Sequence, residues 1–181
     1  RVFVSVRYLA MDGQLGHNQA DLMARENCLG VISKLRRDAV LFEKYEGEQK
    51  PKGAKKKKGD RLKLGEIPRK YWQSQVREKE VVTNYYAGIF LHPSFGMKLK
   101  VVIIEKQNEE TKKIGEAILF SSDLNLGWEK IVEYYSLRFQ IEFNFRDAKQ
   151  HFGLEDFMNQ TQRGVENAVN LSFLMVNLSA K

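Results

Sequence analysis

Five polar side chains recur every three or four residues in the C-terminal part of the 181-residue sequence: Tyr135, Arg138, Glu142, Arg146 and Lys149. At 100° per residue, a helix places all five on one stripe. In such a stripe a carboxylate can hold a divalent metal ion, while the cations on either side hold phosphate oxygens. A plainer alternative is a solvated helix surface, on which Arg138–Glu142 and Glu142–Arg146 form ion pairs of about 0.3–0.5 kcal/mol each. The residues leave both interpretations open.

The stripe needs a helix to carry it, and the sequence has helical periodicity from about Asn125 to Phe152. A second helix is predicted from near Gly164 toward the end of the chain. In the first helix, apolar side chains form an arc beside the polar stripe. We expect this arc to face the core, and its members are Tyr134, Leu137, Ile141, Phe145, Ala148 and Phe152.

A second acid that could do chemistry follows the first apolar run of the chain. Val2–Met11 is rich in β-branched residues, which predicts a strand buried on both faces, and it leads directly into Asp12. Asn18 is expected to cap a helix that continues to about Cys28, with Gly30 as its stop. Val31–Leu35 then predicts another short strand. This strand, helix and strand predict an α/β layer.

The middle of the chain begins with a polar segment, residues 46–68, which contains Pro, Gly and the run Lys55, Lys56, Lys57 and Lys58. Its composition predicts a mobile loop or linker. Two interpretations of the lysine run remain open: a solvated surface loop, or a clamp that attracts phosphates without sequence specificity.

Three strands are predicted after this loop, over Glu80–Leu91, Lys98–Lys106 and Ile114–Ser121. The segments between them, HPSFGM and QNEETKK, have the residues and lengths of turns, which favours an antiparallel meander. A small β insertion is therefore predicted between the α/β unit and the C-terminal helices.

Composition narrows the class of protein and of partner. The net charge of +7 and the pI of about 9.4 favour polyanionic partners. The single Cys28 and the three histidines, His17, His92 and His151, give neither an internal disulfide nor a cysteine-rich zinc site. Neither an apolar run of about 18 residues nor a signal-peptide pattern is present, so we expect no membrane association and a cytoplasmic location.

The spacing Tyr135, Arg138, Glu142, Lys149 is Y-x2-R-x3-E-x6-K, and it resembles the signature of bacterial insertion-sequence transposases of the DDE type. YLAMDGQLGHNQA is similar to the segment around the family's second catalytic Asp, and ISKLRRDA to the strand that follows. LFSSDLNLGWEKIVEYYSLRFQIEFNFRDAKQHFGLEDF resembles the family's last strand and catalytic helix. The resemblance therefore spans nearly the whole chain.

The resemblance implies a ribonuclease H-like fold, incomplete at its N-terminus, with a β-rich insertion before the helix that carries the catalytic Glu. Residues 1–36 would be the second half of the core, 37–124 the basic loop and the insertion, and 125–181 the helices that close the core. The order of elements expected from periodicity agrees with this arrangement.

The resemblance also implies a site and a reaction. Asp12 would be the second and Glu142 the third acid of a triad that holds two Mg²⁺ or Mn²⁺ ions, with Tyr135, Arg138 and Lys149 gripping phosphates beside the cut. Arg146 is added from the helical stripe alone. The implied reaction is hydrolysis at transposon ends followed by strand transfer into target DNA. The implied partner is double-stranded DNA, bound by a dimer at the bacterial nucleoid.

One feature departs from the family pattern. The first catalytic Asp should lie on an earlier strand, but eleven residues precede Asp12, whereas Asp21 and Asp38 follow it. We therefore expect a piece of a longer protein that cleaves DNA poorly by itself. Two alternatives remain: a noncatalytic DNA-binding remnant, and an α+β domain whose charged helix is a salt-bridged surface. Trp128 is expected to pack near the start of the catalytic helix, and Trp72 is given no role.

Overall fold

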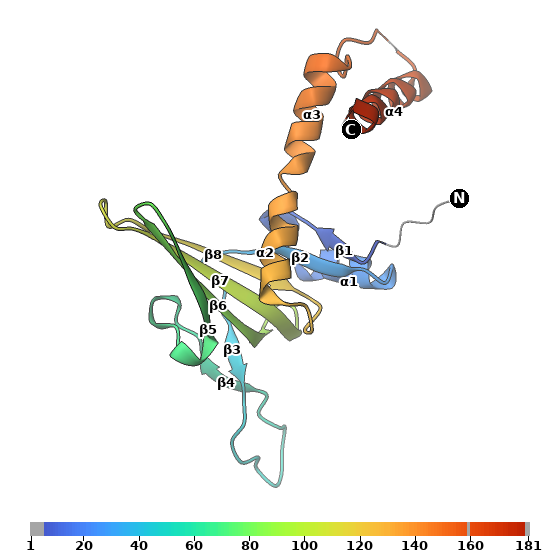
Figure 1. Ribbon diagram of the computed structural model, residues 1–181. Coiled ribbons are helices and arrows are strands. Elements are labelled where there is room, and N and C mark those ends of the chain that lie inside the picture. Colours follow the sequence, from blue (N-terminus) through green and yellow to red (C-terminus); the bar gives the residue numbers. More distant parts are fainter. Residues whose placement is uncertain (1–5, 159, 180–181) are drawn as a thin grey trace. The chain divides into compact units, whose positions relative to one another are not determined.

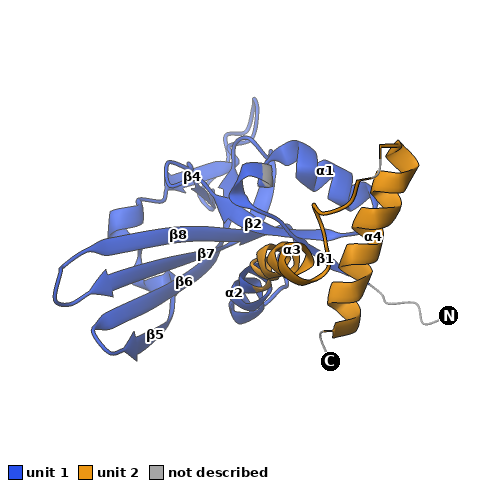
Figure 2. Ribbon diagram, turned by 90° about the horizontal axis from the view of Figure 1, so that it is seen from above, with its two compact units in different colours: residues 1–136 blue, residues 137–181 orange. Residues whose placement is uncertain are grey.

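The computed structural model describes residues 6–158 and 160–179 (Figure 1). The chain forms two compact units, residues 1–136 and residues 137–181 (Figure 2). We call them the sheet unit and the helical unit and describe each by itself. The division falls inside the segment 125–181 that was predicted as one C-terminal helical region.

The sheet unit is built on one eight-stranded, mostly antiparallel sheet. Its strand order is β1-β2-β8-β7-β6-β3-β4, and β5 also pairs with β6. The strands are β1 (Tyr8–Ala10), β2 (Gly30–Leu35), β3 (Phe42–Lys44), β4 (Lys58–Arg61), β5 (Trp72–Glu78), β6 (Val81–His92), β7 (Met97–Asn108) and β8 (Ile114–Ser121). Short 3₁₀ turns cover Gly13–Leu15, Leu64–Glu66 and Arg69–Tyr71.

The predicted meander is confirmed as β6, β7 and β8, whose apolar runs suit strands with two packed faces. These strands do not form a separate sheet, because β8 pairs antiparallel with β2, with Ile32 opposite Ser121. Among the strands of the described residues, only β1 and β2 run parallel, with Tyr8 opposite Gly30. The α/β layer and the predicted β insertion thus share one continuous sheet.

Successive side chains of the central strands point to opposite faces of the sheet, and a core packs on each face. On one face, Val101 of β7 and Phe120 of β8 pack in a cluster with Ala24 of α1 (Asn18–Glu26). On the other, Val102 and Leu119 pack in a cluster with Ile131 of α2 (Trp128–Leu137), which also includes Ile32 and Ala87. The two helices therefore cover opposite faces (Figure 1).

Helix α1 begins and ends differently from the prediction. The N-cap is His17, whose Nδ1 accepts a hydrogen bond from the Ala20 N–H at 3.3 Å, because Asn18 is already helical. The helix stops before Gly30, where Cys28 takes a positive φ of 57°. Gly30 is instead the first residue of β2. For the first strand, residues 6 and 7 precede β1, and the predicted positions 2–5 lie outside the described residues.

Strands β3, β4 and β5 were not predicted. The first two are three and four residues long, and β4 consists of charged residues and Gly59, so neither has a clear apolar alternation. Pairing with neighbouring strands, rather than a local apolar pattern, stabilises β3 and β4. Phe42 of β3 lies opposite both Arg61 of β4 and Leu91 of β6. The segment 46–68, predicted as a loop or linker, therefore contains an ordered strand.

The single helix predicted over Asn125–Phe152 is wrong, because two helices, α2 and α3 (Gln140–His151), replace it. Between them the backbone turns at Arg138 and Phe139, where the Glu142 N–H donates to the Phe139 carbonyl at 3.0 Å, three residues earlier. Neither Pro nor Gly stands at this turn. Because local sequence contains no helix breaker here, periodicity could not indicate the interruption.

The helical unit packs α3 against α4 (Gln162–Ser179), which confirms the second predicted helix. Ala148, Leu154 and Val176 form its small core. Gly153, at φ 65°, reverses the chain after α3 so that the Leu154 N–H reaches the Ala148 carbonyl at 3.0 Å. The Ser172 hydroxyl donates to the Phe152 carbonyl at 2.8 Å and ties α4 to this turn.

The predicted core face of the charged helix is wrong in its middle. Leu137, Ile141 and Phe145 are 50%, 55% and 45% exposed, although Ala148 is fully buried and Phe152 packs beside it. The expectation assumed one straight helix lying on a core. The turn at Phe139 separates Tyr134 and Leu137, which lie on α2, from the later members of the arc, and Tyr134 packs in the sheet unit.

Candidate functional site

Asp12 lies two residues beyond β1, at the carboxyl edge of the parallel pair β1–β2. Its Oδ1 accepts a hydrogen bond from the Gly13 N–H at 2.6 Å and caps the 3₁₀ turn that follows. Its carbonyl oxygen accepts from the hydroxyl of the buried Ser33 on β2, at 3.0 Å. The Met11 N–H donates to the Ile32 carbonyl at 2.9 Å. The sheet therefore fixes the backbone of an exposed carboxylate.

Asp12 lines an open basin of about 520 Å³, together with the residues that end β2. Three of them are cations: Lys34, Arg36 and Arg37. Arg36 also pairs with Asp38, Nε to Oδ1 at 3.1 Å, in a fully solvated setting. A carboxylate bordered by cations can hold a hydrated cation and a phosphate side by side. Sequence reasoning did not select these cations, although they form the basic exit of the second predicted strand.

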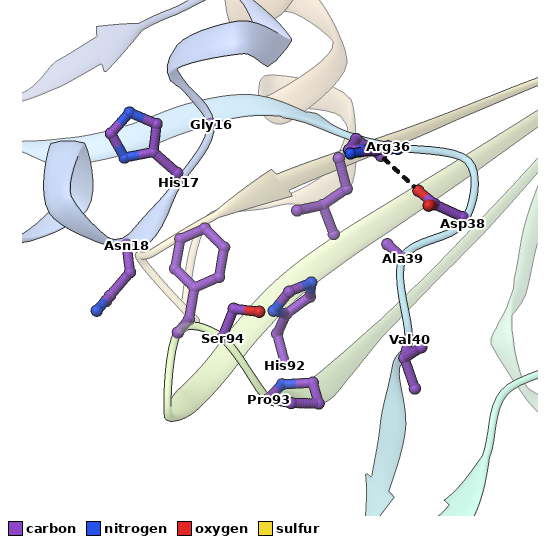
Figure 3. A pocket seen from close by; sticks show the side chains of 12 residues that line it. Gly16, His17, Asn18, Arg36, Asp38, Ala39, Val40, His92, Pro93 and Ser94 are labelled. Carbon is purple, nitrogen blue, oxygen red and sulfur yellow. Dashed lines mark ion pairs between the residues drawn. The ribbon is translucent and has the colours of Figure 1, made fainter.

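A second cavity of about 370 Å³ lies next to this basin and shares Leu35, Arg36 and Asp38 with it. Figure 3 shows it between the start of α1, the chain after β2, and the β6–β7 turn at His92–Phe95. Burial lowers the pKa of His92 below its ordinary value of 6.5. The imidazole, which meets Phe95 edge-on at 5.0 Å, is therefore neutral at pH 7.

Glu142 lies in the first turn of α3 and its side chain is 59% exposed. Arg138 Nη1 lies 3.5 Å from Glu142 Oε1, so the first ion pair considered from sequence does form. The second ion pair considered from sequence, Glu142–Arg146, is not the one that Arg146 makes. Its Nε lies 3.6 Å from Asp147 Oδ1 instead. Lys149 Nζ lies 2.5 Å from Glu155 Oε1.

Glu142, Arg146 and Lys149 keep their common face, because spacings of four and three residues lie within the single helix α3. The side chains of Arg146 and Lys149 are 56% and 48% exposed. Ion pairs at that exposure contribute about 0–1 kcal/mol, so a phosphate could replace either carboxylate partner at little cost. The positions of these side chains are equally consistent with an ion-paired surface and with phosphate binding.

The candidate site residues, including those of the signature, belong to different units. Asp12 and Tyr135 are part of the sheet unit, where Tyr135 lies on α2 and packs against the cluster around Ile131. Arg138, Glu142, Arg146 and Lys149 are part of the helical unit. Tertiary structure thus distributes one linear motif over two compact bodies.

The carboxylates of the candidate site have the donor type of a metal site, but they do not form a cluster of three or more ligands within the described residues. Among residues 6–158 and 160–179, no group of three or more His, Cys, Asp or Glu side chains could hold a metal ion. Asp12 and Glu142 are both exposed carboxylates, which is the donor type that Mg²⁺ and Mn²⁺ prefer. Mg²⁺ keeps several waters, so either exposed carboxylate fits its chemistry with solvent or phosphate oxygens at the remaining positions.

The other candidate residues have clear positions. Lys55, Lys56 and Lys57 lie in the loop before β4, Lys58 begins that strand, and all four are exposed. Trp128 is half-buried and its ring lies 5.1 Å from that of Tyr85, which confirms its expected packing role. Trp72 is 48% exposed and lines a small pocket with Ile67, Arg69 and Tyr86.

Comparison with known families shows the family to which the chain belongs. The family model described as Transposase DDE domain matches residues 7–178, almost the whole chain. The chain belongs to the transposase DDE domain family. No curated protein sequence matches the chain. No helix within the described part of this transposase domain is long and apolar enough to cross a membrane.

Membership supports a function in DNA transposition and an enzyme of the nuclease and transposase class. It also implies binding to DNA, which agrees with the net charge of +7. The mixed α/β architecture with its mostly antiparallel sheet is consistent with a transposase DDE domain.

Proposed function

We propose that this transposase domain is the catalytic part of a bacterial insertion-sequence enzyme, in which Asp12 and Glu142 hold Mg²⁺ or Mn²⁺ at a DNA phosphate. The observation that carries the proposal is the position of Asp12, an exposed acid at the carboxyl edge of a parallel strand pair, inside a basin lined by three cations. Substrate sites of α/β sheets typically lie at such edges.

The side chains have distinct tasks in this proposal. A pair of divalent ions would activate the attacking oxygen and stabilise the leaving oxygen of a phosphodiester. Asp12 and Glu142 supply negative oxygens for those ions, and the turn at Gly13 keeps Asp12 oriented. Arg138 and Lys149 hold phosphate oxygens beside the cut, by charge-assisted hydrogen bonds.

Tyr135 and Arg146 complete the phosphate grip, and Lys55, Lys56, Lys57 and Lys58 add contacts without sequence specificity. The substrate is double-stranded DNA at transposon ends and then target DNA, held by a dimer in the bacterial cytoplasm. Strand transfer follows hydrolysis when a 3′-hydroxyl replaces water as the attacking group.

Iron-directed cleavage tests the two-carboxylate metal site without relying on turnover. Fe²⁺ replaces Mg²⁺, and ascorbate with peroxide then generates radicals that cut the nearby backbone. We expect cuts near residue 12 and near residue 142 in the same protein bound to DNA, suppressed by excess Mg²⁺. Asp12→Asn and Glu142→Gln should each abolish both sets of cuts, because the ions need both acids.

Asp60→Asn and Asp156→Asn are matched controls, one exposed acid in each unit, and should leave the cuts unchanged. Cuts at one of the two positions alone, or cuts that survive both active-site substitutions, would contradict the proposal.

A noncatalytic DNA-binding remnant is the second candidate function. It is favoured by the lack of a three-ligand metal cluster among the described residues. In the same experiment this candidate predicts unchanged DNA binding with no iron-directed cuts at either acid.

A further inference from the structure

The segment from the end of β3 to the first residue of β4, residues 45–58, projects from the sheet unit as a separate arm (Figure 1). We call it the lysine arm. It contains six lysines and two glutamates. The four lysines at positions 55–58 are exposed, and within the described residues none of their ammonium groups pairs with a carboxylate. Because no ion pair within the described residues neutralises these four ammonium groups, the surface that they form is suited to a polyanion.

The base of the arm is anchored to the sheet. Strand β3 pairs with β4 and with β6, and Phe42 lies opposite Leu91. Glu43 accepts hydrogen bonds from the Lys70 ammonium and the Tyr71 hydroxyl, each at 2.8 Å. The bond from Lys70 holds the pKa of Glu43 below its ordinary value. The arm therefore starts from a fixed point.

Gln49 closes the arm further out. Its Nε2 donates to the Lys56 carbonyl at 2.8 Å, and its Oε1 accepts from the Lys56 N–H at 2.9 Å. The carboxamide thus satisfies both backbone groups of Lys56, as a neighbouring strand would. The six residues between them become a closed loop, in which Gly53 takes a φ of 98°.

Aromatic rings orient two of the lysines. The Lys56 ammonium lies 4.4 Å from the centre of the Tyr45 ring, and that of Lys58 lies 5.1 Å from the Phe42 ring. The Tyr45 hydroxyl donates to the Glu48 carbonyl at 3.1 Å, which holds the ring in place. Contacts of this kind keep a cation charged and exposed while they restrict its motion.

We infer that the lysine arm is a preformed clamp for the backbone of a DNA duplex, and that Gln49 is the positioning residue that orders it. The inference rests on the proposed DNA-directed function and adds how one surface achieves it. An arm ordered before binding loses less conformational entropy when phosphates dock, so the same lysine contacts give a higher affinity. Gln49 itself contacts no DNA and acts through Lys56.

The test measures the affinity of the full chain for a 30-base-pair DNA duplex of arbitrary sequence, in EDTA, over a series of salt concentrations. Gln49→Ala should weaken binding about fivefold, because a few residues must be ordered at the moment of binding. The slope of log K against log salt should stay unchanged, because the lysines still reach the same phosphates. Replacing Lys55 to Lys58 with Gln should reduce that slope by about 0.9 for each lost contact.

Two controls match these variants. Gln75→Ala removes an exposed glutamine that bonds Asn84 on the same sheet, outside the arm. Replacing Lys79, Lys106, Lys112 and Lys113 with Gln removes the same charge from β7 and from the β5–β6 and β7–β8 turns, outside the arm. Both should bind DNA like the unsubstituted chain. Amide exchange at Lys56 should accelerate in Gln49→Ala, with the thermal midpoint unchanged.

Equal binding by Gln49→Ala and the unsubstituted chain would overturn the positioning role, and an equal slope change in both four-lysine variants would overturn the clamp. An equal loss of affinity for polyglutamate and for DNA would overturn the choice of a nucleic-acid backbone. Because no metal is present, these outcomes are independent of the iron-directed cuts that test the catalytic proposal.

Discussion

The sheet unit and the helical unit differ in how much of their apolar side-chain surface they bury. In the sheet unit, every central strand contributes to a core on both faces of the sheet. The helical unit buries Ala148, Leu154 and Val176, while Phe139, Ile141 and Phe143 are about half exposed. Asp12 therefore belongs to a well-packed body and Glu142 to a marginal one. Candidate residues of one site can thus have very different structural support.

The largest expected effect compares one substitution in the two units. Phe120 is fully buried and meets Phe95 at 5.2 Å, so Phe120→Ala should destabilise the sheet unit by about 3–5 kcal/mol. Phe145 makes an edge contact with Phe173 at 4.9 Å, and Phe145→Ala should cost about 1 kcal/mol. Both tryptophans lie in the sheet unit, so denaturant unfolding followed by their fluorescence reports that unit.

Far-ultraviolet circular dichroism adds the signal of α3 and α4. The contrast between the units would be lost if the two alanine variants shifted the fluorescence transition by the same amount.

The second prediction concerns the cations of the helical unit. Arg138→Ala combined with Lys149→Ala should weaken DNA binding about tenfold and lower the salt slope by about 1.8, because two phosphate contacts disappear. Fluorescence anisotropy with a labelled duplex measures both quantities. Arg163→Ala removes an exposed cation of the same unit from outside the stripe and should bind DNA normally. Unchanged affinity in the double variant would support the purely ion-paired interpretation.

The third prediction compares how far the same kind of glycine substitution lowers the melting temperature of the smaller and of the larger unit. Gly153 and Gly96 have φ values of 65° and 64°, and a Cβ at either position meets no atom closer than 3.9 Å. Gly→Ala should therefore cost about 1–2 kcal/mol at each site, through backbone conformation alone. The same energy shifts the melting temperature more in a smaller unit. Thermal melts should show a larger shift for Gly153→Ala by circular dichroism than for Gly96→Ala by fluorescence.

The smallest effect is the pH dependence that His92 gives to the sheet unit. Its folded pKa lies below the unfolded value of 6.5, so below that pH the unfolded chain binds a proton that the folded chain does not. This contribution to stability is present above pH 6.5 and is lost as the pH falls toward the folded pKa. His92→Gln should flatten that slope in urea titrations followed by fluorescence. His151→Gln, in the other unit, should leave the fluorescence transition as it is.

Sequence patterns predicted the elements that have a strong local signal. The apolar runs of β2, β6, β7 and β8 and the helical spacing of α4 are local properties, so they appear in the sequence alone. Short polar strands such as β4 lack this signal, because pairing with β3 stabilises them. The same limit applies to the turn at Phe139, which no local residue requires.

For the candidate site, the sequence by itself determined the residue types and their spacing. It predicted an acid after the first strand and a charged face that keeps Glu142, Arg146 and Lys149 together, because neighbours on one helix follow from spacing alone. Tertiary structure alone decided that cations ending β2 share a basin with Asp12, and that Tyr135 and Glu142 belong to different units. Those relations depend on strand pairing and on the packing of distant segments, which no linear pattern encodes.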